Sequence, residues 1–246
     1  EHPITMQDLI EWGALNEELA NLFSDLVRAG YNIFVCGGTG SGKTTFLNAI
    51  SNYIKKERVV TIEDSAELRL SSVENLVRLE TRNKNVEGEN EITIRDLIRS
   101  SLRMRPDRII VGEVRGEEAL DLLQAMNTGH DGSLSTGHGN SPQDMLSRLE
   151  IMVLMGVEMP ISAIRAQIAS AIDILVFLGR LRDRSRKVLE IVELTGYENG
   201  EIQIHPLYQF VETGQEKGRI QGEWRGSKER LKMRKKLLAA GICWNK

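Results

Sequence analysis

The residues with the clearest chemical potential lie in the glycine-rich segment GGTGSGKTTF, residues 37–46. Gly37, Gly42, Lys43 and Thr44 have the spacing GxxxxGK[ST] of a phosphate-binding loop. Glycines let backbone N–H groups turn inward around phosphate oxygens, while the lysine neutralises charge and the threonine hydroxyl ligates Mg²⁺. The sequence therefore predicts a site for ATP and Mg²⁺. Its predicted nucleotide-binding residues are Gly37, Gly38, Thr39, Gly40, Ser41, Gly42, Lys43, Thr44 and Thr45.

Two acidic segments follow predicted strands. Glu113 follows the apolar run 108–111 at its C-terminal end, and Glu63 with its neighbour Asp64 ends the run 59–62. Ligands of open α/β sheets bind at the carboxyl ends of the strands, where a carboxylate can orient the attacking water or support the metal. The alternatives are an exposed glutamate at a strand end and ordinary solvation of a loop.

Gly112 stands where many such sites carry an aspartate for Mg²⁺. Magnesium is therefore expected to depend on Thr44, on water and on other carboxylates. The predicted metal-associated residues are Thr44, Glu63 and Glu113.

The segment GHDGSLSTGHGNSP, residues 129–142, holds two of the four histidines. His138 follows a predicted strand and precedes a helix that Ser141 caps, so it can reach a γ-phosphate as a sensor. A purely structural role for His138 stays open. His130 lies in a glycine-flanked turn and is the weaker candidate, with stabilisation of that turn as its alternative role.

Eight arginines surround the acidic segments. Arginine can spread the transition-state charge of a phosphoryl group, either within one subunit or from a neighbour. Arg78 and Arg82 are the two candidates, because they follow a predicted strand beside the acidic loop. A solvated surface is the better interpretation for most of the eight.

The elements that must position these residues alternate between strands and helices, which predicts an α/β fold with a mainly parallel sheet covered on both faces. The predicted helices cover 6–29, 44–54, 93–104 and 116–127, then segments beginning at 142 and after 160, and a basic helix over 228–240. The predicted strands cover 32–36, 59–62, 76–79, 108–111 and 133–138, followed by 173–180, 187–194 and 201–210 as antiparallel strands. The basic run 228–236 is interpreted as a solvated helix face, with an anionic partner as the alternative.

Composition supports a folded domain. Hydrophobic residues make up 41% and charged residues 27% of the 246 residues, and the net charge of -3 provides no global attraction to nucleic acid or anionic lipid. No apolar run approaches about 18 residues and no signal peptide is visible, so a cytoplasmic setting is expected.

Four segments in their order resemble the type II/IV secretion ATPase family, the GspE-like superfamily. They are GGTGSGKTTFLNAIS, TIEDSAELRL, RPDRIIVGEVRG and STGHGNSP, which match its Walker A, aspartate box, glycine-bearing Walker B and histidine box. The similarity covers about residues 4–212. The sequences of the four segments are closest to those of the CpaF branch, which serves Flp/Tad-type pilus assembly. Gly112 is part of the family pattern.

The resemblance implies a RecA-like P-loop ATPase core. Family members form cytoplasmic hexameric rings that engage a platform protein at the inner membrane and couple ATP hydrolysis to pilin or protein export. Glu113 would then be the catalytic glutamate, Glu63 an aspartate-box carboxylate near the metal and His138 the histidine-box residue. Arg78 and Arg82 would be phosphate-contacting arginines, and no specific nucleic acid is expected.

The resemblance also divides the chain. Residues 1–30 correspond to a helical linker after the N-terminal domain of family members, 31–212 to the ATPase domain and 213–246 to a basic tail. We expect weak ATPase activity and impaired ring formation from these residues alone. Two other classes of function stay open at this point, a RecA-like nucleic-acid motor and an ATP-binding switch without productive turnover.

Overall fold

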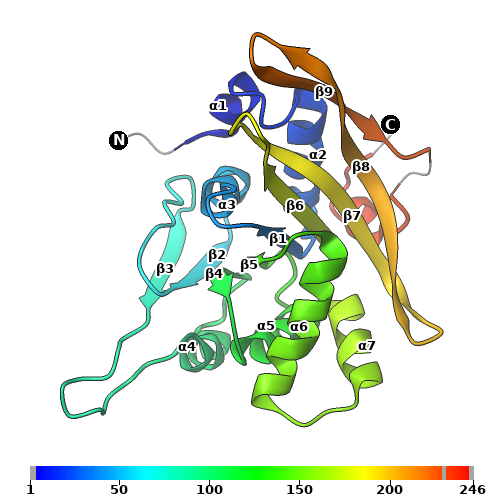
Figure 1. Cartoon of the computed structure of the whole chain (residues 1–246). Helices are drawn as coiled ribbons and strands as arrows, with labels where there is room; N and C mark the ends of the chain where they lie inside the picture. Colours follow the sequence, from blue (N-terminus) through cyan, green and yellow to red (C-terminus); the bar gives the residue numbers. More distant parts are fainter. Residues whose placement is uncertain (1–3, 229–230, 244–246) are drawn as a thin grey trace.

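The fold is built around one large sheet. The computed structural model describes residues 4–228 and 231–243, within which nine strands form a single sheet in the order β3-β2-β4-β5-β1-β6-β7-β8-β9 (Figure 1). The strands from β3 to β6 pair in parallel, and β6 to β9 pair antiparallel. The strands are β1 Ile33–Gly37, β2 Arg58–Glu63, β3 Asn75–Glu80, β4 Arg108–Val114, β5 Leu134–His138, β6 Ile174–Arg180, β7 Arg186–Glu198, β8 Glu201–Glu216 and β9 Arg219–Gly226. The predicted mainly parallel sheet with added antiparallel strands is confirmed.

Helices cover both faces of this sheet (Figure 1). Successive strand residues point to opposite faces, so Ile33 and Val35 pack beneath α1, α2 and α3, whereas Phe34 and Cys36 pack beneath α4 to α7. Strands buried on both faces are continuously apolar, as β1 is, which is why the short apolar runs predicted them. The helices are α1 Met6–Glu11, α2 Glu17–Arg28, α3 Lys43–Ser51, α4 Ile94–Ser101 with the 3₁₀ turn η1 Leu102–Met104, α5 Glu118–Asn127, α6 Pro142–Gly156, α7 Ile161–Ala171 and α8 Lys235–Ala239.

The strand order brings the predicted site segments to one edge of the sheet. In the central part, β2, β4, β5 and β1 are consecutive neighbours and all run the same way. Gly37 at the end of β1 lies in register with His138 at the end of β5. The strand ends that carry Glu63, Glu113 and His138 therefore lie beside the glycine-rich loop.

The helix expected over 6–29 is two helices, so that prediction is wrong as a single element. Gly13 has φ +67° between α1 and α2, a left-handed conformation that ends a helix and favours glycine. Asn16 then starts α2, because its side-chain oxygen accepts the backbone N–H of Leu19 at 2.9 Å. The predicted domain boundaries at residues 30 and 212 stay predictions, although β8 runs through residue 212.

The basic helix expected over 228–240 is much shorter than predicted. Residues 219–226 form β9, and only α8, over Lys235–Ala239, is α-helical within the described part of the tail. Arg230, one of the cations assigned to the helix face, lies outside the described residues.

The described tail packs its apolar side chains against the domain, while Lys228, Lys232 and Lys235 of the basic run are exposed. Leu231 and Leu237 are buried in the core beneath α1 to α3. Lys236 Nζ lies 2.7 Å from carboxylate oxygens of Asp131 and Asp173. Lys236 therefore forms ion pairs within the domain.

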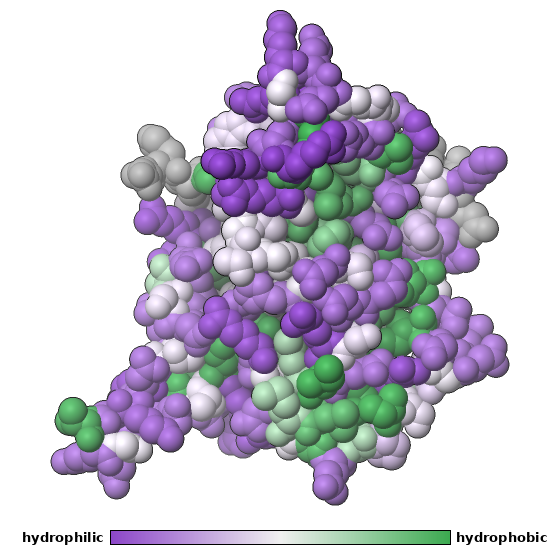
Figure 2. Space-filling view, in the orientation of Figure 1, coloured by the Kyte–Doolittle hydropathy of each residue, from purple (hydrophilic) through white to green (hydrophobic). Residues whose placement is uncertain are grey.

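Figure 2 shows a mostly polar face with an apolar area over α6 and α7. Exposed apolar side chains there are Ile151, Leu154, Met155 and Ile161. Within residues 4–228 and 231–243, no single helix is long and apolar enough to cross a membrane. Helices α6 and α7 meet the length and composition only together, with a bend of 119° between them.

Candidate nucleotide site

The glycine-rich loop between β1 and α3 has the form of an anion cradle. Gly40 and Gly42 have φ +72° and +97°, backbone conformations that only glycine adopts without strain. No side chain caps the N-terminus of α3, so its first N–H groups and the positive end of its dipole face the loop. Lys43 Nζ donates hydrogen bonds to the carbonyls of Gly37 at 3.1 Å and Gly38 at 3.2 Å, which holds the ammonium inside the cradle.

This loop forms one wall of a cavity of about 650 Å³. The other walls come from the ends of β2, β4 and β5 and from the start of β7. The cavity is lined by Thr39, Gly40, Gly42, Lys43, Thr44, Thr45, Glu63, Asp64, Ser65, Glu67, Gly112, Glu113, Arg115, Thr136, His138 and Arg186. Thus Glu63, Glu113 and His138, which the sequence places far apart, meet at Lys43 and Thr44 as the parallel sheet requires.

Glu113 is aimed into the cavity by an irregularity in β4. The register between β4 and β5 shifts between Val111 and Val114, and such a bulge redirects the side chains it carries. Arg115 Nε donates to Glu113 Oε2 at 2.6 Å. The other oxygen, Oε1, lies 2.7 Å from His138 Nε2, within ion-pairing distance, yet it is buried and accepts no hydrogen bond of good geometry.

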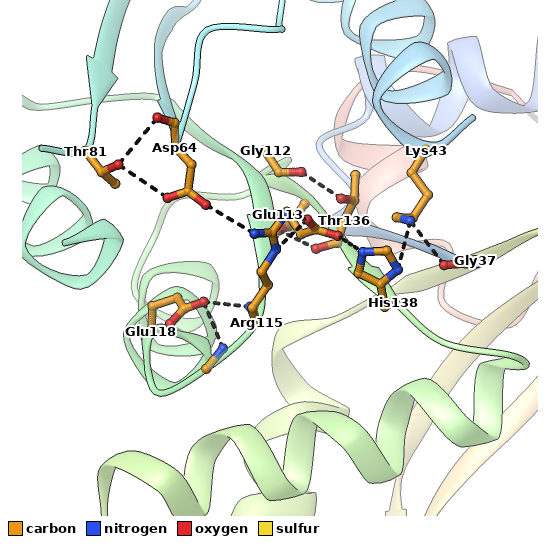
Figure 3. Close-up of polar contacts among 12 residues, drawn as sticks. Gly37, Lys43, Asp64, Thr81, Gly112, Glu113, Arg115, Glu118, Thr136 and His138 are labelled. Carbon is orange, nitrogen blue, oxygen red and sulfur yellow. Dashed lines mark hydrogen bonds and ion pairs between the residues drawn. The ribbon is translucent and has the colours of Figure 1, made fainter. Parts of the chain in front are cut away.

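His138 lies between Lys43 and Glu113 (Figure 3). Its Nδ1 is 3.4 Å from Lys43 Nζ, and an ammonium can only donate, so Nδ1 acts as the acceptor. In the neutral ring this leaves the proton on Nε2, facing Glu113. Burial lowers the pKa of His138 below its ordinary value, against the opposing pull of Glu113, which favours the neutral ring.

Burial likewise lowers the pKa of Lys43, while the neighbouring Glu113 raises it. The two basic groups are therefore partly desolvated and close to one carboxylate. A polyanion entering the cavity would meet both of them together with the free N–H groups of the loop.

Glu63 is only 5% exposed, and one of its oxygens is already in use. Oε1 accepts the backbone N–H groups of Glu67 at 3.0 Å and Leu68 at 2.9 Å, which holds the loop after β2. Burial raises the pKa of Glu63, and these two N–H donors oppose the shift. Glu63 thus shapes the cavity wall, and its Oε2 stays available for water or a metal shell.

The structure supplies a physical reason for Gly112. A Cβ at this position would lie 3.1 Å from Glu63 Cγ and 3.5 Å from its Oε1. The space where many nucleotide sites with such a loop have a metal-binding aspartate on this strand is here taken by Glu63, which comes from the adjacent strand β2.

Three of the sequence candidates do not reach the cavity. Arg78 is exposed on the edge strand β3, and Arg82 is exposed with its Nε donating to Asn90 O at 2.8 Å. Neither lines the cavity, so phosphate contact by these arginines stays a prediction that requires a neighbouring subunit. His130 Nδ1 lies 3.2 Å from Ala125 O, which fits the loop-stabilising alternative.

Two cavity arginines were missed. Arg115 was left among the surface arginines, although its place two residues after Glu113 was a usable signal. Arg186, whose Nε donates to Gly40 O at 2.7 Å, comes from the β6–β7 hairpin and has no recognisable spacing to the loop. Only the pairing of β6 with β1 brings it there.

The side-chain oxygens that line the cavity fit a magnesium ion that is bound mainly through nucleotide oxygens. Among the described residues no group of three or more His, Cys, Asp or Glu side chains could hold a metal by itself. Thr44 lines the cavity at the start of α3, and Glu113, whose Oε1 faces His138, lines the same cavity. Mg²⁺ typically keeps several waters and binds through few protein oxygens plus phosphates.

A second, smaller cavity of about 240 Å³ shares Gly42, Thr45 and Arg186 with the first. Apolar side chains, including Trp12 and Phe46, line much of it. It adjoins the loop and contains neither Glu113 nor His138. The loop therefore has a polar chamber with the acids and a partly apolar chamber beside it.

Comparison with known proteins gives a consistent picture. A family model described as "Type II/IV secretion system protein" matches residues 1–221. Conjugal transfer protein TrbB of Rhizobium radiobacter is 36% identical over 213 residues, which cover 85% of this chain and 62% of TrbB. Type IV secretion system protein PtlH of Bordetella pertussis is 42% identical over 171 residues, which cover 67% of this chain and 50% of PtlH.

Among solved structures, the VirB11 ATPase of the Brucella suis type IV secretion system, in complex with sulphate, superposes with a TM-score of 0.65 and 33% identity. The match covers 76% of this chain and 54% of that one. The chain thus spans between half and two thirds of the length of these relatives.

Proposed function

The chain belongs to the type II/IV secretion system protein family, and on that premise we propose that it is the ATP-hydrolysing core of a secretion or transfer motor. The observation that carries the proposal is the convergence of Lys43, Thr44, Glu113 and His138 on one cavity. Composition alone would not distinguish such a motor from another α/β domain.

The loop binds the triphosphate. Free N–H groups of the loop and of α3 donate to phosphate oxygens, and Lys43 balances the charge near the β- and γ-phosphates. The polar chamber then receives the γ-phosphate. The neighbouring chamber with Trp12 and Phe46 gives the nucleoside an apolar surface, which supports a nucleotide over a smaller phosphate compound.

Glu113 Oε1 orients the attacking water and accepts its proton. The water oxygen forms a bond to the γ-phosphorus while the bond to the bridging oxygen breaks, and ADP leaves with that oxygen. His138 offers its Nε2–H to the γ-phosphate once ATP has entered. A neutral ring suits this sensing role, because it can make or release the hydrogen bond without a change of charge.

Mg²⁺ would be held by the Thr44 hydroxyl, with Glu63 and Glu113 placed to bond its waters. When bound, it neutralises the charge that develops on the phosphoryl oxygens. Glu63 also keeps the loop after β2 in place.

The assembly is proposed from the relatives. TrbB is named a conjugal transfer protein, and PtlH and VirB11 belong to type IV secretion systems. We infer a homo-hexameric ring that engages a platform protein at the cytoplasmic side of the inner membrane and exports protein or pilin. A narrower form of the same proposal is that the protein drives assembly of a Flp/Tad-type pilus, as in the CpaF branch.

The experiment is equilibrium binding of a fluorescent ATP analogue, followed by phosphate release from ATP with and without Mg²⁺. We expect binding and slow hydrolysis, with both lost in Lys43→Gln. Lys84→Gln is the matched control, because Lys84 is exposed on the loop before α4, pairs with Glu91 and lies outside the cavity. ATP hydrolysis that requires single-stranded DNA would favour the nucleic-acid motor, and binding without any hydrolysis would favour the switch.

A further inference from the structure

Arg115 is flanked by acidic side chains. Its Nε donates to Glu113 Oε2 at 2.6 Å, and its Nη2 contacts the same oxygen. On the other side, its Nη1 lies 3.6 Å from Asp64 Oδ2. Its backbone N–H donates to Glu118 Oε1 at 2.6 Å, so both the main chain and the side chain of Arg115 are held (Figure 3).

Packing does not force this arrangement. The Arg115 side chain is 63% exposed, so burial does not hold it in this position. It instead folds back onto the residue two positions earlier. The hydrogen bond to Glu113 raises the pKa of Arg115 above its already high value, so the guanidinium stays charged wherever the protein is folded.

The contact between Arg115 and Glu113 Oε2 determines which oxygen of Glu113 can take part in the reaction. Two donors of one rigid guanidinium fork engage Oε2 and thereby limit rotation of the carboxylate. Oε1 is left buried on the side of His138 and Lys43, where its near neighbour is His138 Nε2 at 2.7 Å. Asp64 holds the far end of the fork and itself accepts a hydrogen bond from Thr81 Oγ1 at 3.3 Å.

We propose that Arg115 is a positioning residue that fixes the Glu113 carboxylate so that Oε1 faces the attacking water. The inference rests on the proposed ATPase function and assigns Arg115 no contact with the nucleotide. Arg115 acts only through Glu113, which distinguishes it from an arginine that binds phosphate directly.

The test is a double-mutant cycle measured by single-turnover hydrolysis of radiolabelled ATP with the protein in excess. Arg115→Gln is expected to slow hydrolysis by about 10- to 100-fold, the usual consequence of losing a charged hydrogen bond that orients a reacting group. The dissociation constant for ATP is expected to change by less than about threefold. In the Glu113→Gln background, Arg115→Gln should change the remaining rate by less than about twofold, because its target is already gone.

A merely structural role would slow both backgrounds by the same factor, so equal losses overturn the proposal. A loss of ATP affinity as large as the loss of rate would make Arg115 a phosphate-binding residue and also overturn it. Arg115→Lys, which offers one donor in place of a fork, should recover part of the rate, and it replaces the glutamine variant in the cycle if that variant does not fold.

Arg225→Gln is the matched control. Arg225 is 61% exposed and pairs with Glu223 on β9, outside the cavity. Its replacement should leave turnover unchanged. If the unaltered protein does not hydrolyse ATP, the proposed function and this inference fail together, whereas hydrolysis that is insensitive to Arg115→Gln removes only the inference.

Discussion

Replacing Gly112 by aspartate, the residue common at this place in other phosphate-binding sites, should damage this protein. The new Cβ would lie 3.1 Å from Glu63 Cγ, closer than side chains normally approach. Glu63 cannot move away freely, because its Oε1 accepts backbone N–H groups of Glu67 and Leu68 at 3.0 and 2.9 Å. The substitution therefore adds both volume and charge beside a buried carboxylate.

The steric and the electrostatic cost can be separated by comparing the asparagine and aspartate variants. Overpacking of this kind costs about 1–3 kcal/mol of unfolding free energy and should be common to Gly112→Asn and Gly112→Asp. Two carboxylates about 4 Å apart at an effective dielectric constant of about 20 repel by about 4 kcal/mol. We expect Gly112→Asp to be about 2–4 kcal/mol less stable than Gly112→Asn at pH 7, since rotation of the side chain relieves part of the repulsion.

The assay is urea unfolding of both variants at pH 7 and about pH 5. Repulsion raises the carboxyl pKa in the folded state, and burial already does so for Glu63. The penalty is therefore absent below the unfolded pKa, grows between the unfolded and the folded pKa and is complete above the folded pKa, so the gap should shrink to about 1–2 kcal/mol at pH 5. Equal stability of the two variants at pH 7, or a gap that ignores pH, would refute this reasoning.

The matched control is Gly214, which has open space around its Cβ position and lies exposed in β8. Gly214→Asn and Gly214→Asp should agree within about 0.5 kcal/mol.

Three further predictions concern other parts of the molecule. Arg78→Gln and Arg82→Gln should leave ATP binding by the isolated subunit unchanged in a fluorescence titration, because both residues lie outside the cavity, and a loss of affinity there would contradict the geometry. The lowered pKa of His138 keeps the ring neutral down to lower pH than an ordinary histidine, so a pH–rate profile should stay flat through about pH 6.5 and fall only at more acidic pH; an alkaline requirement would argue against a neutral sensor. Lys236→Met should lower the unfolding free energy by about 1–3 kcal/mol in urea, because it leaves the largely buried Asp173 without its cation, and an unchanged midpoint would show that α8 does not stabilise the domain.

The fold and the main site residues were predictable because they depend on local pattern. Continuous apolar runs mark strands buried on both faces, and parallel strands bring their carboxyl ends to one edge. This physical rule suffices to place Glu63, Glu113 and His138 near Lys43. The spacing of the glycines in the loop predicted that the ligand is a nucleoside triphosphate.

The rest depended on the order and register of the strands, which no local pattern encodes. The Glu63–Gly112 contact exists because β2 and β4 are neighbours, and Arg186 reaches the loop because β6 lies beside β1. Arg78 was predicted near phosphate, but β3 became the outermost strand of the parallel part and leaves that side chain exposed.

The most direct test of the central claim is the effect of Glu113→Gln on ATP binding and on hydrolysis, measured side by side on the same protein. The substitution keeps the shape of the side chain and removes its basicity. We predict a dissociation constant for ATP within about threefold of the unaltered protein and a single-turnover rate lower by about 10²- to 10⁴-fold. A variant that still hydrolyses ATP at nearly the original rate would show that this carboxylate does not activate the water, and it would contradict the account.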